Sequence, residues 1–204
     1  MSEIKGINKD FASAVGFAAG ACFYTNFNKD AQCPTSAAQK MSELAGWESL
    51  GEPDQVGMTE EKKSENKFHK GGHLTNFIAL GGTTEFTFKA SFLETARASV
   101  TKLRYGVDAV EVNEDGSFKA VRVKQDAGRI VEVPLVIDFL ESTTGNLLRY
   151  VIKRAAVSGF DTLDNKPGEP KKYGFTFTAL DTGDGSAYIE IYRAKPVTSV
   201  SSLG

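Results

Sequence analysis

The clearest pattern of hydrophobic and polar positions runs from Thr84 to Leu93. Apolar side chains occupy every second position there, and mostly polar side chains fill the positions between them. A period of two is typical of a strand with one buried face. The pattern therefore predicts a strand whose buried face carries Phe86, Phe88, Ala90 and Phe92.

The period changes after this strand. Ala96, Val100 and Leu103 are spaced four and three residues apart, which places them on one stripe of a helix. Glu94 would begin this helix, where the helix dipole favours an anion, and Gly106 would end it. We therefore predict a helix directly after the strand, with Val100 and Leu103 as core anchors.

Similar alternation predicts further strands before and after this stretch, and Asp115-Gly116 between two of them predicts a hairpin. Pro134 indicates an edge or irregular position in its strand. About eight strands and one helix predict a mainly β fold, a two-sheet β-sandwich or barrel with one flanking helix. The predicted strands lie at 14–25, 107–112, 117–124, 130–141, 146–155, 173–180 and 187–193.

The segment 52–72 has a different character. Residues 56–59 look extended, but the run 60–67 is polar at nearly every position. Such a run cannot bury a face in the core of its own domain, so we expect a long loop or hairpin that is solvated or ordered by another molecule. Trp47, Leu50 and Gly51 form an anchor before it, and we expect Trp47 and Leu50 to pack under its start.

Composition alters this picture little. The chain has 204 residues, 41% of them hydrophobic, and a net charge of −2, which gives no overall basic footprint for nucleic acid. We expect one domain over 1–204, with a flexible N-terminal arm at about 1–13 and a tail at about 194–204. The longest apolar run is too short to cross a bilayer, and Cys22 and Cys33 are expected to be reduced thiols in a cytoplasmic setting.

Candidate catalytic and metal-binding patterns are weak. His69 and His73 are four residues apart, but they flank Gly71-Gly72, which disfavours the helix that would bring them together. The glycines before Thr84 lack the Gly-Lys-Ser/Thr of a phosphate loop, and the Asp-rich turn at 181–185 lacks the spacing of a calcium loop. We therefore predict no enzyme activity, no cofactor and no metal ion.

Taken together, the segments resemble the major tail tube proteins of bacteriophages with long, non-contractile tails, especially those of actinobacterial phages. The order and spacing of several short motifs carry this resemblance over about residues 14–193. The motifs are Trp47-Glu48-Ser49-Leu50-Gly51, Gly57-Met58-Thr59, the charged stretch to Gly71-Gly72, the stretch 84–106, the run from Leu148 to Val157, Gly168-Glu169-Pro170, and the run from Tyr173 to Leu180.

The resemblance implies a virion protein that is assembled in the cytoplasm of a bacterial host. Copies would form hexameric rings that stack into a hollow tube. The tube would house the tape measure protein and later conduct DNA without specific binding, because an acidic lumen repels phosphates. The remaining implied partners are the tail terminator and the distal tail or tip proteins, and no membrane insertion is implied.

In that setting the polar segment would be ordered by neighbouring subunits. We expect Glu61 and Glu65 to face the lumen. The residues expected at contacts between subunits and rings are Val56, Gly57, Met58, Thr59, Glu60, Glu61, Lys62, Lys63, Glu65, Lys67 and Phe68.

Two other functions fit the same sequence pattern. A tube protein of a contractile injection or secretion system would share the fold and the ring assembly. A monomeric carbohydrate-binding β-sandwich would present an aromatic platform, for which Tyr188 and Tyr192 are placed on one strand face.

Overall fold

A computed structural model gives the structure of the chain and describes residues 15–16, 22–64, 67–70, 76–80, 84–123, 130–141, 144–163, 166–183 and 189–195. The expected arm at 1–13 and the tail from residue 196 lie outside these ranges. The strands are β1 (Val15–Gly16), β2 (Cys22–Thr25), β3 (Glu48–Ser49), β4 (Pro53–Ser64), β5 (Lys67–Lys70), β6 (Asn76–Leu80), β7 (Thr84–Phe92), β8 (Val110–Val112), β9 (Phe118–Val121), β10 (Glu132–Glu141), β11 (Leu147–Phe160), β12 (Tyr173–Ala179) and β13 (Ile189–Ala194). The helical segments are α1 (Ala98–Tyr105) and the 3-10 turns η2 (Met41–Glu43) and η3 (Val107–Ala109).

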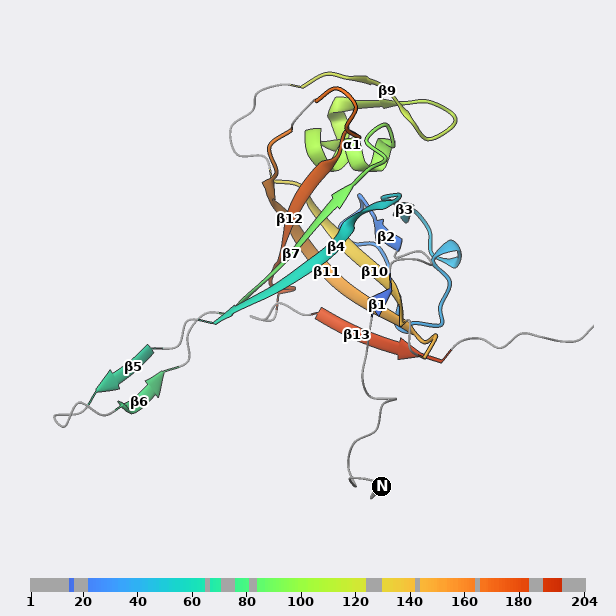
Figure 1. Cartoon of the computed structure of the whole chain (residues 1–204). Helices are drawn as coiled ribbons and strands as arrows, with labels where there is room; N and C mark the ends of the chain where they lie inside the picture. The colour runs from blue at the N-terminus through green and yellow to red at the C-terminus, as the bar shows by residue number, and fades with distance from the viewer. Residues whose placement is uncertain are drawn as a thin grey trace, which may run out of the picture.

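One nine-stranded antiparallel sheet makes up most of the fold. Its main path is β3–β2–β10–β11–β12–β7–β4, with β1 paired to the end of β10. β11 pairs with β13 as far as Ile152 and with β12 from Ala155 onwards, so the sheet divides along this strand and curls (Figure 1). The prediction of a mainly β fold is confirmed, and the main sheet is a single curled one.

The main core lies between the concave side of this sheet and α1. At its centre the Phe92 ring packs edge-on against Phe23, with 5.1 Å between ring centroids, and lies 5.9 Å from Phe175. Leu50, Val100 and Leu103 are completely buried in the same cluster. Phe88 is also buried, whereas Phe86 is half-buried at the margin of the core.

The helix is shorter than predicted. It begins at Ala98, and Ala96, which we expected on its buried stripe, is exposed in the preceding turn. The reason is the side chain of Glu94, which accepts a hydrogen bond from the backbone N–H of Glu52 at 2.9 Å and therefore fixes the chain in a turn. Gly106 ends the helix with a φ of 93°, as the sequence predicted.

The burial of β10 differs from the prediction made from the sequence. We expected one buried face, but the strand is buried on both, because the segment 26–47 covers the outer side of β10 and β11. There Met41, Leu44, Val136 and Val151 form a second cluster, and Trp47 packs against it. Trp47 therefore does not lie under the start of segment 52–72, whereas Leu50 lies in the main core. Pro134 lies at a shift of register within this central strand.

An ion pair lies beneath the covering segment. Both guanidinium nitrogens Nε and Nη2 of Arg149 donate to the carboxylate of Asp138 at 2.6 Å, and the Arg149 side chain is only 3% exposed. Its Nη1 donates to the carbonyl oxygens of Ser36 and Gln39 at 3.0 and 2.6 Å. The pair therefore joins two central strands to the covering segment.

Two tyrosines should make the free energy of unfolding fall at alkaline pH. Burial, followed by hydrogen bonds to Tyr105 and Cys22 respectively, raises the pKa of Tyr173 and of Tyr24 to about 12. Because these folded-state values exceed the ordinary 10.0, folding favours the neutral phenols. Their contribution to stability is complete below pH ~10 and is lost as the pH rises toward ~12.

We therefore expect the urea midpoint of unfolding to fall between pH ~10 and ~12. Absorbance of tyrosinate at alkaline pH should show tyrosines that ionise late, Tyr24 and Tyr173 among them, and Tyr173→Phe should remove one of them. A midpoint that stays constant across this range would contradict the prediction.

Candidate assembly surface

The polar run of segment 52–72 is a strand. β4 pairs with β7 in a continuous register that matches Met58 with Ala90, Glu60 with Phe88 and Ser64 with Thr84. We had expected residues 60–67 to be solvated or ordered by another molecule. The side chains of residues 60–64 are exposed, as expected, but these residues form a strand rather than a loop, because backbone hydrogen bonds to β7 order them within the chain and require no apolar face.

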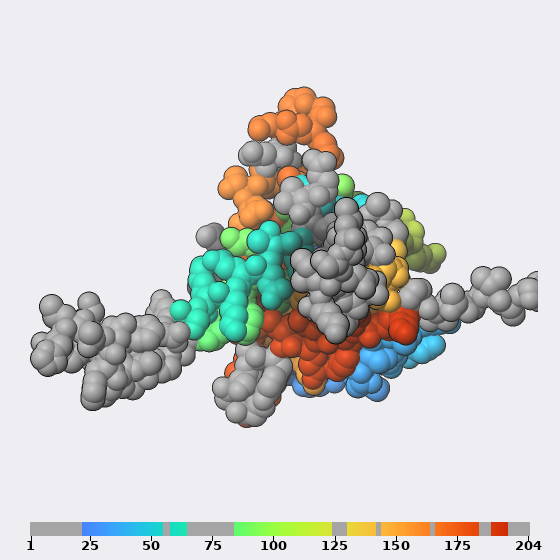
Figure 2. Space-filling view, turned by 60° about the horizontal axis from the view of Figure 1, so that its bottom comes forward, coloured from blue at the N-terminus to red at the C-terminus, as the bar shows by residue number. Residues whose placement is uncertain are grey.

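Together β4 to β7 form a long projection. Beyond Ser64 the chain forms β5, which pairs with β6 and leads back to β7. We call β5, β6, residues 60–64 and residues 84–88 the arm. Figure 1 shows the arm extending away from the curled sheet, and Figure 2 shows β4 (teal) on the molecular surface.

The predicted contact residues are distributed along this arm and its base. Val56, Gly57, Met58 and Thr59 lie in the part of β4 nearer the body, and Glu60, Glu61, Lys62 and Lys63 lie in its outer half. Lys67, Phe68 and His69 belong to β5, a strand, which agrees with our expectation of no helix there. Glu65 and His73 lie outside the described residues.

The outer half of β4 carries charge on both faces. Thr59, Glu61 and Lys63 are exposed, and Lys63 lies 3.6 Å from Glu61. On the opposite face, the ammonium group of Lys62 lies 5.3 Å from the centre of the Phe86 ring. The arm thus covers a half-buried phenylalanine with a lysine side chain, as long cationic side chains commonly do.

Glu60 faces the concave side of the sheet. Burial, and then the negative charge of Glu60, raises the pKa of the Tyr150 hydroxyl above its ordinary value. Tyr150 stacks edge-on against Phe139 with 5.5 Å between the ring centroids. Glu60 therefore lies at the margin of the core, whereas Glu61 lies on the outer face.

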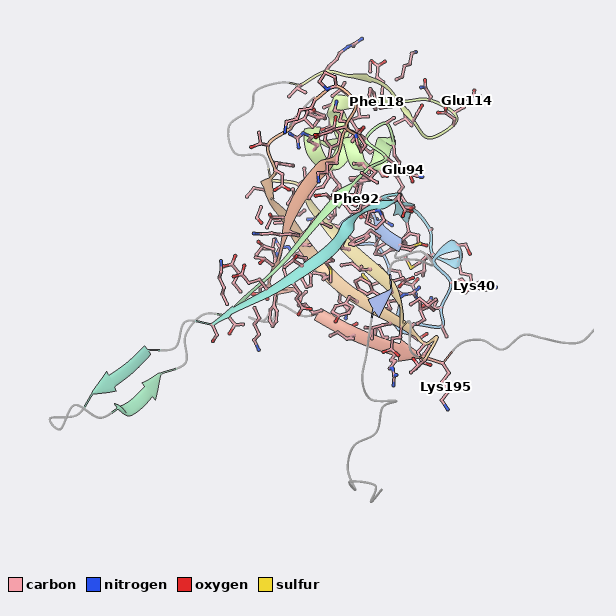
Figure 3. All side chains as sticks on the ribbon, viewed as in Figure 1. Lys40, Phe92, Glu94, Glu114, Phe118 and Lys195 are labelled. Carbon is pink, nitrogen blue, oxygen red and sulfur yellow. The ribbon has the colours of Figure 1, made fainter. Side chains whose placement is uncertain are left out.

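The base of the arm is held by Glu94. Its carboxylate accepts hydrogen bonds from the backbone N–H of Glu52 at 2.9 Å and from Nε of Arg97 at 2.8 Å. Figure 3 shows Glu94 beside Phe92, where β7 leaves the core and α1 begins. Gly51 passes over this carboxylate with a φ of 77°, so the direction in which β4 starts depends on a close approach between backbone and side chain.

A second contact holds the start of β4. Nζ of Lys172 donates to the carboxylate of Asp54 at 2.7 Å, and this hydrogen bond, together with the charge of Asp54, raises the pKa of Lys172. The lysine is exposed, so the contact orients the arm more than it stabilises the fold.

β4 and β3 are the edge strands at the two ends of the main path, and β13 is a further edge strand, paired only with β11. Within the described ranges β4 pairs only with β7, and β3 only with β2. The edge of β4 from Met58 to Lys63 that faces away from β7 has no second strand partner within the described ranges, and such an edge can pair with another chain. The chemistry available at this surface is therefore strand pairing and charge pairing.

The described part of the chain was also compared with the metal-binding and aromatic sites that the sequence suggests. It holds no group of three or more His, Cys, Asp and Glu side chains that could bind a metal ion. Cys22 and Cys33 are both free thiols, and the hydroxyl of Tyr192 donates to Glu190 at 2.7 Å. Tyr188, the other half of the predicted aromatic platform, lies outside the described residues.

Among the helices of the described ranges, none has the length and hydropathy needed to cross a membrane. No protein-family model and no curated protein matches this chain.

Proposed function

We propose that this protein is the tail tube subunit of a long-tailed bacteriophage, a structural protein whose copies form hexameric rings that stack into a hollow tube. The sequence resemblance described above suggests this class. The observation that carries the proposal is the arm, a hairpin that leaves the body and whose β4 edge, from Met58 to Lys63, has only β7 as a strand partner within the described ranges. In the tube, neighbouring subunits pair with that edge.

The composition of the arm supports the same function. A two-stranded unit such as β5–β6 is at best marginally stable alone in water. The sequence of residues 66–83 includes Phe68, Leu74, Phe77, Ile78 and Leu80, and it contains no acidic residue. A neighbouring subunit that covers β5 and β6 would stabilise this two-stranded unit by burying apolar side chains.

The outer face of the sheet suits a water-filled bore. Next to the outer face of β4, β7 carries the exposed Lys89 and the buried Thr87, which pair with Thr176 and Thr178 of β12. Thr178 donates to the hydroxyl of Ser158 at 2.8 Å, so small hydroxyl side chains satisfy one another there. We propose that this face lines the lumen, with Glu61 as one of its charges, and that the tape measure protein and later DNA pass over it.

Shortening the arm tests the proposal. Residues 65–83 are replaced by an Asn-Gly turn that joins Ser64 to Thr84, which are paired in the ladder. Because a two-residue turn suits two strands that are already in register, the β4–β7 ladder is retained. We expect a folded monomer whose free energy of unfolding changes by less than about 1 kcal/mol, and no tubes by negative-stain electron microscopy.

The unaltered chain at the same concentration is the reference and should form tubes. The shortened chain keeps the surface that receives a neighbour's arm, so adding it to the unaltered chain should shorten the tubes. Tubes of normal length from the shortened chain alone would refute the proposal.

A further inference from the structure

Strand β13 is an edge strand of the main sheet that carries an exposed apolar side chain. One side of β13 pairs with β11 from Leu147 to Ile152, and its other side has no strand partner within the described ranges. Ile191 of this strand is 54% exposed. A free edge that presents a large apolar side chain favours pairing with another chain. β13 therefore has the properties of a contact between subunits.

β4 is the edge strand that can meet β13. The other strands of the main sheet with a single strand partner in the described ranges are β1 and β3, which have only two residues each. A ring requires a heterologous contact, in which two different surfaces of neighbouring copies meet. Figure 1 shows β4 running toward the arm and β13 running toward the opposite side of the view, which suits antiparallel pairing between copies.

The faces of the two strands limit how they can pair. In β4, Glu60 faces the concave side and Glu61 lies on the outer face. In β13, Ile189 packs against the main core and Tyr192 against the cluster on the outer side, so its odd-numbered residues face the concave side. Residues directly opposite each other in a sheet point to the same face. Even-numbered residues of β4 therefore pair with odd-numbered residues of β13.

One antiparallel register matches the charges of the two edges. It places Glu60 opposite Arg193 on the concave side and Lys63 opposite Glu190 on the outer face. The side chains of Arg193 and Glu190 are 41% and 31% exposed, so both are accessible to a neighbour. No like charges face each other in the remaining pairs, and opposite charges in directly paired positions stabilise a sheet.

The neighbouring registers bring like charges together. A shift of two residues in one direction places Glu61 opposite Glu190. A shift in the other direction places Lys62 opposite Arg193. Parallel registers with five or more pairs over residues 58–64 and 189–195 form one of these same contacts or place Lys62 opposite Lys195. Because like charges in directly paired positions are destabilising, charge favours the single register above.

We propose that β4 of one subunit pairs with β13 of the next subunit in the ring, antiparallel and with Glu60 opposite Arg193. The pairing rests on the proposed tube and identifies the partner of the β4 edge. The side-chain stem of Lys62 then covers Ile191 of the neighbour, next to the Phe86 ring that its ammonium group already approaches. Both free edges gain backbone hydrogen bonds, and the exposed apolar side chain is buried.

A second copy of β4 is the competing partner of the β4 edge. Two β4 strands paired antiparallel can place Glu60 opposite Lys63 and Glu61 opposite Lys62, which also avoids like charges. That pairing joins two identical edges, so it gives a closed dimer instead of a ring. It also leaves Ile191 exposed.

Cysteine cross-linking of the full-length chain tests the pairing. Thr59→Cys and Ala194→Cys are directly opposite in the proposed register and leave both charge pairs intact. On oxidation, the double variant should give a ladder of covalent multimers up to the hexamer on a non-reducing gel. Lys63→Cys combined with Ala194→Cys is the matched control, because the four-residue offset of about 13 Å exceeds the span of a disulfide. The single variants, which retain Cys22 and Cys33, should give no ladder either.

Charge reversal in the cross-linking background tests the register. Lys63→Glu alone, or Glu190→Lys alone, should lower the yield of the ladder about fivefold, because each places like charges opposite each other. The two reversals together should restore most of the yield, whereas pairing between two β4 strands predicts no such rescue.

The outcomes separate this pairing from the tube proposal. A covalent dimer as the largest product, or an unchanged yield for both single reversals, would overturn the pairing of β4 with β13. Tubes that form without the ladder would overturn the pairing while leaving the tube proposal intact. A ladder without tubes would support the pairing and count against the tube, and the absence of both would count against both.

Discussion

Replacement of Arg149 by methionine should lower the free energy of unfolding by about 3–5 kcal/mol. The substitution leaves the buried carboxylate of Asp138 without its bidentate partner. It also removes the donor that binds the carbonyl oxygens of Ser36 and Gln39, which hold the covering segment on the sheet. Removing one partner of a buried ion pair is strongly destabilising because the remaining charge stays buried without compensation. Urea unfolding monitored by the fluorescence of Trp47, the last residue of this covering segment, measures the change.

Two further variants isolate the cause. Arg149→Met combined with Asp138→Leu should recover most of the lost stability, because an apolar pair of similar volume can replace a buried ion pair. Arg154→Met breaks the pair between Arg154 and Glu132, whose side chains are 45% and 34% exposed, and should cost less than about 1 kcal/mol. If Arg149→Met and Arg154→Met lowered the free energy of unfolding equally, the buried pair would contribute no more to stability than the exposed pair, and the prediction would be wrong.

This ion pair also shows where sequence reasoning ends. Alternation in 146–155 correctly separated Leu148, Tyr150 and Ile152 from Arg149 and Val151. It could not show that the second face is covered, because the cover comes from residues 26–47, more than a hundred positions away. Periodicity reports the faces of an element, whereas burial of both faces depends on long-range contacts.

The strands and the hairpin at Asp115-Gly116 were predictable for the opposite reason. Their signals are local: alternation over a few residues, and a glycine where the turn requires a φ of 82°. The helix start was missed because the Glu94 carboxylate binds the backbone of Glu52, 42 residues earlier in the chain. The prediction that the helix begins at Glu94 used the helix dipole alone and did not include this contact with Glu52.

The arm was predicted only in part. Its polar run was recognised as unable to form a core, which is correct, since residues 59–64 are exposed. The inference that it therefore lacks order within the chain was wrong, because β7 supplies a backbone partner. Side-chain polarity limits packing but does not limit strand pairing, and this distinction separates an arm from a solvated loop.

Replacement of Gly51 by alanine should destabilise the protein by about 2–5 kcal/mol and disrupt tube formation, although it changes no residue of the arm. The φ of 77° costs an alanine about 1–2 kcal/mol. In addition, the new Cβ would lie 2.5 Å from the carboxyl carbon of Glu94, which must then release the Glu52 N–H. Gly116→Ala is the matched control, since its φ is 82° and no atom lies within 4 Å of its Cβ.

The difference between the two glycine variants measures the collision with Glu94. Glu94→Ala removes the colliding carboxylate, so Gly51→Ala should cost little more than Gly116→Ala in that background, and the two substitutions at the base should be strongly non-additive. Because β4 starts at Pro53, directly beyond this contact, a shifted base redirects the whole arm. We therefore expect Gly51→Ala to abolish tubes in electron microscopy under conditions in which Gly116→Ala retains them. Equal losses of stability and equal tube yields for the two variants would refute the assignment of Glu94 as the base of the arm.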